Sequence, residues 1–177
     1  IMIADATPLL RSLRMVKSAV EIEKIAHIGA VTSRTFAKVA EFASAGQPLV
    51  NVFRAFRQQA LADGADDIPY LVGGADRGGY DDVISPPTSR PLQSGDILML
   101  DTGAAWDGYF CDFDRNFAIK KADAPSQKAY DTLWRATQAG LKIARIIVIT
   151  EQNPEIFENA AAHIEAFSTR YDEKFKD

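Results

Sequence analysis

The chain has 177 residues, with 20 Lys and Arg against 24 Asp and Glu, and 47% of its residues are hydrophobic. This length and composition are typical of a single globular domain, and they exclude collagen-like and intrinsically disordered chains. The formal net charge of -4 gives no basic surface for a phosphate backbone, and no stretch is long and apolar enough to cross a bilayer. We therefore expect neither nucleic acid nor a membrane as a partner.

The only cysteine is Cys111, which cannot form a disulfide within the chain. The first residues lack the basic region and the long apolar region of a signal peptide. These two features predict a reducing, cytoplasmic location. The chain begins with Ile1 and Met2, as we expect for a piece of a longer product.

Helical periodicity covers two early segments. Residues 18–45 begin with Ser18 and Glu21 at the spacing of a capping box, and apolar residues then recur every three or four positions. A second apolar stripe begins at Leu49, after Pro48, and ends at Gly64. The sequence therefore predicts two helices before any strand.

Short apolar runs between glycines and prolines follow. They predict strands at residues 70–72 and 80–84, separated by a glycine-rich turn at residues 73–79. Residues 97–102 and 109–119 are predicted to form a hairpin joined by the loop 103–108, which contains an Asp-Gly step.

The last part of the chain reads as helix, strand and helix. Residues 125–144 have a helical apolar face, residues 146–149 are a β-branched run that predicts a strand, and residues 154–176 predict a final helix. No linker or repeat divides the chain. We therefore expect one domain, residues 1–177, with an α+β fold in which helices pack on one face of a mostly antiparallel sheet.

Carboxylates gather on the predicted hairpin. Because side chains alternate along a strand, Asp112, Asp114 and Asn116 share one face of the second strand, whereas Cys111 and Phe113 share the other. A pairing that places Asp101 opposite Asp112 would bring two like charges together, and a divalent cation with oxygen ligands relieves such repulsion. The alternative is that Asp101 starts the turn and that Asp112 and Asp114 point into water.

The sequence GDILMLDTGAAWDGYFCDFDRNF, residues 95–117, resembles the metal-binding hairpin of the pita-bread superfamily, which includes methionine aminopeptidases, Xaa-Pro aminopeptidases, prolidases and creatinase. In that pattern a Gly-Asp leads an apolar strand ending in Asp-x-Gly, a Gly-Tyr follows, a second Asp stands eleven residues after the first, and an Arg three further on. The matching residues are Gly95, Asp96, Asp101, Gly103, Gly108, Tyr109, Asp112 and Arg115.

The flanking segments agree with this resemblance. Residues 13–25 look like the junction and first helix of a prolidase-type catalytic domain, and residues 124–144 look like the helix after the hairpin. The resemblance covers about residues 11–145, leaves residues 146–177 as a divergent tail of strand plus helix, and implies the first half of a pita-bread fold. By the same resemblance, Asp101 and Asp112 are the first two ligands of a site for two divalent ions, such as manganese, cobalt or zinc. Asp112 would bridge both ions, and Asp114 and Arg115 would lie just outside the ligands.

The rest of the family's site is not visible in the sequence. The family takes a His and two Glu as further ligands, but Glu158, His163 and Glu165 of the tail are typical of the solvated flank of a helix. Ile84 or Ser85 stands where family peptidases place an upstream His, and His27, inside the first helix, is typical of a packing residue. We therefore assign no catalytic residue and expect the chain alone to be inactive.

The resemblance implies a metal-dependent hydrolase similar to Xaa-Pro dipeptidases and aminopeptidases, with a small peptide or other small molecule as substrate in intact relatives. Two alternatives remain open: a creatinase-like hydrolase of a small C–N substrate, and a non-catalytic structural module that keeps the fold. A lone half should also expose the sheet edge and the face with Ile97 and Met99. We therefore expect a homodimer.

Overall fold

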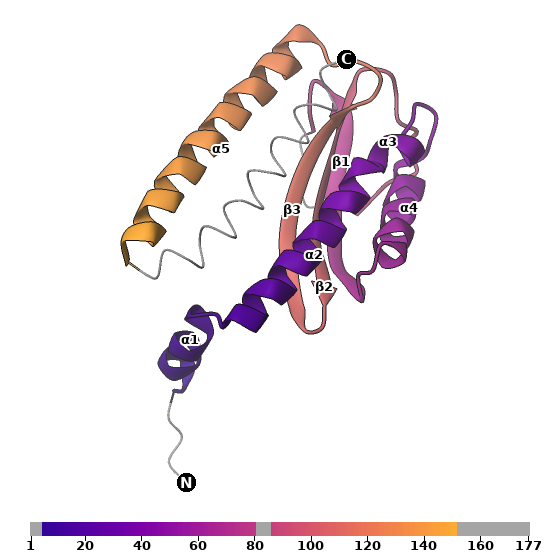
Figure 1. The fold of residues 1–177 in the computed structure, drawn as a ribbon. Coiled ribbons are helices and arrows are strands. Elements are labelled where there is room, and N and C mark those ends of the chain that lie inside the picture. Colours follow the sequence, from indigo (N-terminus) through magenta and orange to yellow (C-terminus); the bar gives the residue numbers. More distant parts are fainter. Residues whose placement is uncertain (1–4, 81–85, 152–177) are drawn as a thin grey trace. The chain divides into compact units, whose positions relative to one another are not determined.

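The computed structural model describes residues 5–80 and 86–151, with side chains as far as Leu141. The chain divides into two compact units, residues 1–122 and residues 123–177. The first contains α1 (Thr7–Met15), α2 (Ala19–Ala37), α3 (Val39–Phe42), α4 (Leu49–Ala62), β1 (Asp67–Arg77), β2 (Asp96–Trp106) and β3 (Tyr109–Ala118). The second contains α5 (Ala124–Glu151). The predicted α+β class is confirmed (Figure 1).

Helix α2 begins where the sequence predicts. The Ser18 hydroxyl accepts a hydrogen bond from the Glu21 backbone N–H, and the Glu21 carboxylate accepts one from the Ser18 N–H at 2.7 Å. The predicted helix 18–45 is wrong in one respect, because it is interrupted at Lys38 and continues only as the short α3. Thr32 and Thr35 donate side-chain hydrogen bonds to carbonyls one turn back, and such bonds weaken a helix locally.

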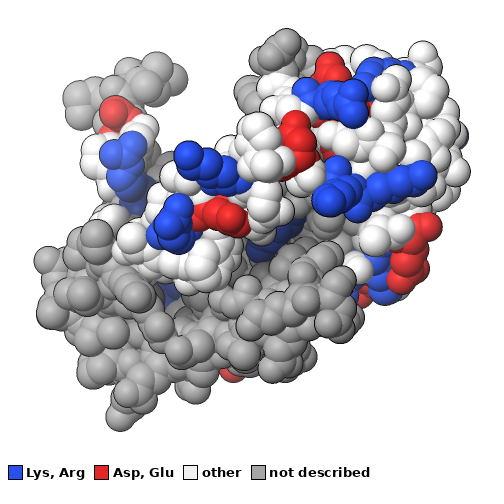
Figure 2. Space-filling view, turned by 90° about the horizontal axis from the view of Figure 1, so that it is seen from above, with Lys and Arg blue, Asp and Glu red and all other residues white. Residues whose placement is uncertain are grey.

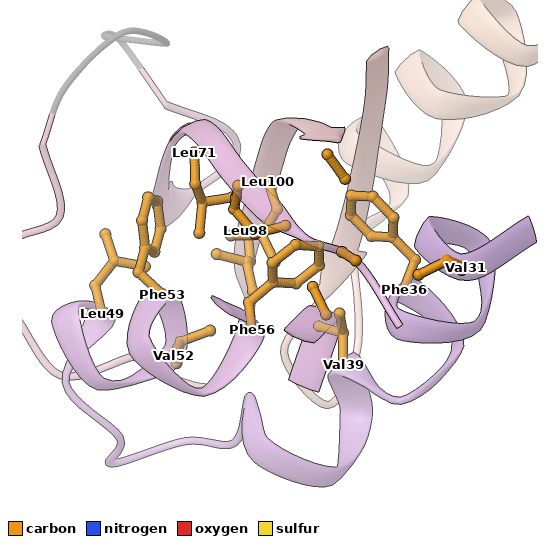
Figure 3. Packing of buried hydrophobic residues seen from close by; sticks show 14 of the residues in the cluster. Val31, Phe36, Val39, Leu49, Val52, Phe53, Phe56, Leu71, Leu98 and Leu100 are labelled. Atoms are coloured by element: carbon orange, nitrogen blue, oxygen red, sulfur yellow. The ribbon is translucent and has the colours of Figure 1, made fainter. Parts of the chain in front are cut away.

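Helices α2 and α4 pack on one face of the sheet, as predicted, and the core lies between these helices and the sheet (Figure 3). Phe36 and Phe56 meet at 4.9 Å between ring centroids. The core also includes Val31, Val52, Leu71, Leu98 and Leu100, all at most 5% exposed. Burial of this apolar surface is the main force that holds the helices on the sheet.

Strand β1 is longer than predicted and runs through the expected turn. Pairing with β2 continues from Val72 through Gly73 and Gly74 to Arg77. Any side chain at Gly73 would overlap the Met99 carbonyl group, so glycine here allows close approach of two strands. The predicted strand 80–84 lies almost wholly outside the described residues, and Tyr80 itself is not in a strand.

Strands β2 and β3 form the predicted antiparallel hairpin, but with a shorter turn. The turn is Asp107-Gly108, with φ of 47° and 78°, and Trp106 already pairs with Tyr109. Residues 103–106 are therefore strand, not loop. Positive φ at both positions is the geometry of a type I′ turn, whose twist matches that of the flanking strands.

Ion pairs tie the elements of the first unit together. Lys38 on the α2–α3 junction pairs with Asp63 after α4, and Lys24 on α2 pairs with Asp107 of the hairpin turn at 2.6 Å. Figure 2 shows basic and acidic side chains next to one another on the visible part of the described surface. The more exposed pair, Lys24–Asp107, contributes little stability, whereas the Asp63 carboxylate is only 9% exposed and is less screened by water.

Helix α5 overturns the predicted strand at residues 146–149, because the helix continues through them to Glu151. The β-branched run follows a long helical segment with no proline or turn residue at its start, and helix propagation overrides the local β preference. The predicted helix 154–176 lies outside the described residues. Among the helices the structure describes, none is long and apolar enough to cross a membrane.

Candidate metal centre

Three aspartates lie on the face of the sheet opposite the helices. Leu100 and Thr102 of β2 are fully buried on the helix side, and Cys111 of β3 contacts Thr32 of α2 there, with Sγ and Oγ1 3.0 Å apart. Since side chains alternate along a strand, Asp101 on β2 points to the other face, together with Asp112 and Asp114 on β3. The predicted division of β3 into an acidic face and a core face is confirmed, and Cys111 is a core residue.

The register within this cluster differs from the predicted one. Asp101 pairs with Asp114, and Asp112 pairs with Gly103, two residues from the expected partner. The two-residue turn causes this shift. A shift of two preserves the face of every side chain, whereas a shift of one would reverse it. The three carboxylates therefore still share one face, with Asp101 directly opposite Asp114 and diagonal to Asp112.

Asp101 is the least exposed to water of the three side chains. Its Oδ1 is buried and has no hydrogen-bond partner among the described residues. Desolvation raises the pKa of Asp101, the negative charge of Asp112 raises it further, and Tyr70 offsets part of the increase. A buried carboxylate oxygen without a donor costs stability unless a proton or a cation neutralises it.

Asp114 is also electrostatically unfavourable. Incomplete hydration raises its pKa, and the charge of Asp101 raises it again, while Arg115 acts in the opposite direction. The Arg115 guanidinium lies over the Phe113 ring at 5.0 Å, and its Nη1 donates to the Asp114 carbonyl oxygen at 2.6 Å. Arg115 is thus adjacent to the cluster in sequence but stacks on an aromatic ring of the opposite, core-facing side.

Two tyrosine hydroxyls border the carboxylates, and sequence reasoning missed both. Tyr70 on β1 donates to Asp112 Oδ1 at 2.5 Å, and Tyr80 donates to Asn116 Oδ1 at 2.9 Å. Desolvation raises the pKa of each hydroxyl, and nearby carboxylates add to it, so both stay protonated donors near neutral pH. The signal that could have found Tyr70 is its pairing with Gly103, which requires the register of β1.

The arrangement fits part of a divalent metal site. Its donors are carboxylate oxygens on a rigid hairpin, which suit hard cations such as Mg²⁺, Ca²⁺ or Mn²⁺, and the partnerless Asp101 oxygen is one that a cation would satisfy. Among the residues that the structure describes, no three His, Cys, Asp or Glu side chains form a group that could hold a metal ion. A complete site therefore needs donors beyond these residues.

Of the other candidate residues, His27 is the one that lies within the described chain. His27 packs against Trp106 with 4.3 Å between ring centroids and 41° between the ring planes, as expected for a packing histidine. Ile84, Ser85, Glu158, His163 and Glu165 lie outside the described residues.

Met99 corrects one expectation about this face. We expected it to be exposed, but it is 3% exposed in the single chain.

Comparisons with known proteins identify the family to which the sequence pattern of the hairpin points. The model of Metallopeptidase family M24 matches residues 23–175. Probable dipeptidase PepE of Mycobacterium tuberculosis is 32% identical over 148 residues, which are 83% of this chain and 39% of the relative. The crystal structure of dipeptidase PepE from Mycobacterium ulcerans superposes with a TM-score of 0.70 at 31% identity, over 76% of this chain and 36% of that one.

A more distant solved structure shows the same fold. X-Pro aminopeptidase from Thermotoga maritima MSB8 has a TM-score of 0.69 at 21% identity, over 77% of this chain and 39% of that one. The chain thus spans about two fifths of the length of these relatives. With a family model that covers most of its length, the chain belongs to metallopeptidase family M24.

Proposed function

We propose that this chain supplies one half of the metal site of a peptide-cleaving hydrolase, with Asp101 and Asp112 as metal ligands. The observation that supports this most is the buried Asp101 Oδ1, which has no donor among the described residues although two more carboxylates lie on the same face. A fold without a ligand to bind would gain stability by replacing such a group. The family and the dipeptidase names of the relatives support hydrolysis of small peptides.

The residues of the hairpin have distinct roles in this proposal. Asp101 and Asp112 would hold the divalent metal through their carboxylate oxygens. Asp114 adds negative charge beside them, and Arg115 limits that charge from the other side of β3. Divalent ions in such a site polarise a carbonyl group and lower the pKa of water, which is the chemistry that amide hydrolysis needs.

Metal binding by the isolated chain is the first test. Calorimetric titration with Mn²⁺ should show weak binding to the wild type, because two carboxylates supply only part of the oxygen shell. Asp112→Ala should abolish the binding. The matched control is Asp131→Ala on α5, which removes an exposed aspartate that accepts from Gln127 and lies in the other unit. Equal binding by wild type and Asp112→Ala would refute the proposal.

Catalysis by the isolated chain is the second test. We propose that the purified chain alone does not hydrolyse Xaa-Pro dipeptides, because the described residues bring together carboxylates and hydroxyls but no histidine or glutamate donor. A panel of dipeptides should therefore show no turnover, and creatine in the same panel tests the C–N hydrolase alternative. Robust cleavage that Asp101→Ala abolishes would show that donors outside the described residues complete the site.

We also propose a two-fold homodimer located in the cytoplasm. Among the described strands β3 pairs only with β2, which makes it an edge strand, and its Phe110 is 63% exposed. An open edge with an exposed aromatic side chain favours self-association. Light scattering at micromolar concentration, with and without Mn²⁺, should report the mass of a dimer, and a monomer under both conditions would refute this part.

A further inference from the structure

Three residues from three strands form one row across the acidic face. Tyr70 on β1 pairs with Gly103 on β2, and Gly103 pairs in turn with Asp112 on β3. Neighbouring strands are about 4.8 Å apart, so Tyr70 and Asp112 are separated by two strand spacings, roughly 10 Å. Side chains at that separation do not normally meet. The Tyr70 hydroxyl nevertheless reaches Asp112 Oδ1 at 2.5 Å.

Gly103 makes this contact possible. A Cβ at position 103 would lie 2.9 Å from Tyr70 Cδ1 and closer still to Cε1. The phenol ring therefore lies directly over the glycine backbone and crosses β2 to reach β3. The Thr102 hydroxyl donates to the Tyr70 carbonyl oxygen at 2.9 Å, which fixes the backbone from which the ring extends.

The hydrogen bond has little value for folding alone. Asp112 is exposed, so water would satisfy its carboxylate if the tyrosine were absent, and a bond that replaces a water contact contributes little net stability. What the bond does is orient the carboxylate. The phenolic proton is donated to one oxygen of Asp112, and the same hydroxyl also lies close enough to Asp101 to favour its charged form.

We propose that Tyr70 is a positioning residue for Asp112, and that Gly103 is glycine so that the Tyr70 ring can cross β2 to that ligand. This inference rests on the proposed metal site. Groups that hydrogen-bond to metal ligands fix the orientation of those ligands, and their loss typically weakens metal binding about 10- to 100-fold.

The test compares two tyrosines that each donate to a residue on the acidic face of β3. Tyr70→Phe and Tyr80→Phe each remove one hydroxyl, but Tyr80 donates to Asn116, which is not a proposed ligand. Calorimetric titration of the full 177-residue chain with Mn²⁺ should show affinity reduced at least about tenfold in Tyr70→Phe and within about a factor of two of wild type in Tyr80→Phe. Thermal unfolding without metal should be similar for all three proteins.

A spectroscopic measurement separates positioning from a general loss of structure. With Co²⁺ as the probe, the visible absorption at saturation should change in Tyr70→Phe and stay as in wild type in Tyr80→Phe, because only the first variant alters a ligand's geometry. Wild-type affinity and spectrum in Tyr70→Phe would overturn the inference and leave the proposed metal site standing. Absence of binding by the wild type would overturn both.

Discussion

Two aspartates on strand β2 differ in how their carboxylates are hydrogen-bonded. Asp96, at the start of the strand, is fully buried and accepts hydrogen bonds from Arg90 at 2.7 and 3.1 Å and from the Gln93 N–H at 2.8 Å. Asp101, five positions on, lies on the opposite face with its Oδ1 buried and partnerless within the described residues. Both oxygens of Asp96 thus have donors, whereas one oxygen of Asp101 has none among the described residues.

The pKa values of the two groups follow this difference. Burial raises the pKa of Asp96, but the hydrogen bonds and charge of Arg90 outweigh it, and the pKa is lowered from its ordinary value. Desolvation and the charge of Asp112 raise the pKa of Asp101. The comparison indicates that the charge of Asp96 stabilises the folded chain, whereas the charge of Asp101 destabilises it. The Gly95-Asp96 part of the family pattern is structural, and the proposed role of the Asp101 part is to bind metal.

The largest expected effect is loss of the satisfied aspartate. Asp96→Ala should lower the free energy of unfolding by about 3 kcal/mol, because it leaves Arg90 without its buried partner. The value lies at the low end of the usual range because Arg90 is 33% exposed and keeps Asp76 at 3.2 Å. Urea unfolding with excess chelator measures this change, and Asp76→Ala is the control. A loss under about 1 kcal/mol would show that the pair of Asp96 with Arg90 contributes little to the stability of the fold.

The next effect concerns the packing over Gly103. Gly103→Ala should cost about 1–3 kcal/mol, because the new methyl group displaces the Tyr70 ring. The double variant Tyr70→Ala with Gly103→Ala should be no less stable than Tyr70→Ala alone, since the methyl group then has room. Additive losses in the double variant would place the strain elsewhere.

A smaller effect of opposite sign is expected at the unsatisfied aspartate. Asp101→Asn should raise the free energy of unfolding by up to about 1 kcal/mol near pH 7, because it removes a like charge facing Asp114. Urea unfolding with chelator, with Asp131→Asn as the control, measures this gain. Destabilisation by Asp101→Asn without metal would contradict the comparison.

The pH dependence follows from the signs of the pKa shifts. A raised folded-state pKa means that the folded chain binds the proton more tightly, so the penalty of Asp101 is full above that pKa and disappears below the ordinary value of about 4. The gain from Asp101→Asn should therefore shrink as the pH falls. The contribution of Asp96 has the opposite course, being full above its ordinary pKa and lost as the pH falls through the lowered one. A gain from Asp101→Asn that grew in acid would contradict this assignment.

Much of this arrangement was predictable from local sequence signals. The Ser18 capping box, the core face of β3 and the acidic face of the hairpin depend only on helix periodicity and strand alternation, and all three are confirmed. The family resemblance carried by residues 95–117 is confirmed as well.

What could not be predicted depends on tertiary contacts. The predicted register of the hairpin was wrong by two residues. The composition of residues 103–108 is compatible both with the predicted six-residue loop and with the two-residue Asp107-Gly108 turn that forms. The Tyr70 contact needs three strands to be in register at once. The continuation of α5 through residues 146–149 is a different case, because there helix propagation overrides the local β preference. Sequence patterns predicted which face of the sheet a residue lies on, but they did not predict which residues of neighbouring strands lie opposite one another.

The central claim is that the instability of the acidic face marks a metal site, and one measurement tests it most directly. Urea unfolding of wild type and Asp101→Asn should be compared in chelator and in saturating Mn²⁺. Without metal the variant should be the more stable. With Mn²⁺ at roughly 100 times the dissociation constant the wild type should gain about 2.7 kcal/mol and the variant much less, so the order of stability reverses. An equal shift in both proteins, or no shift in either, would contradict the account.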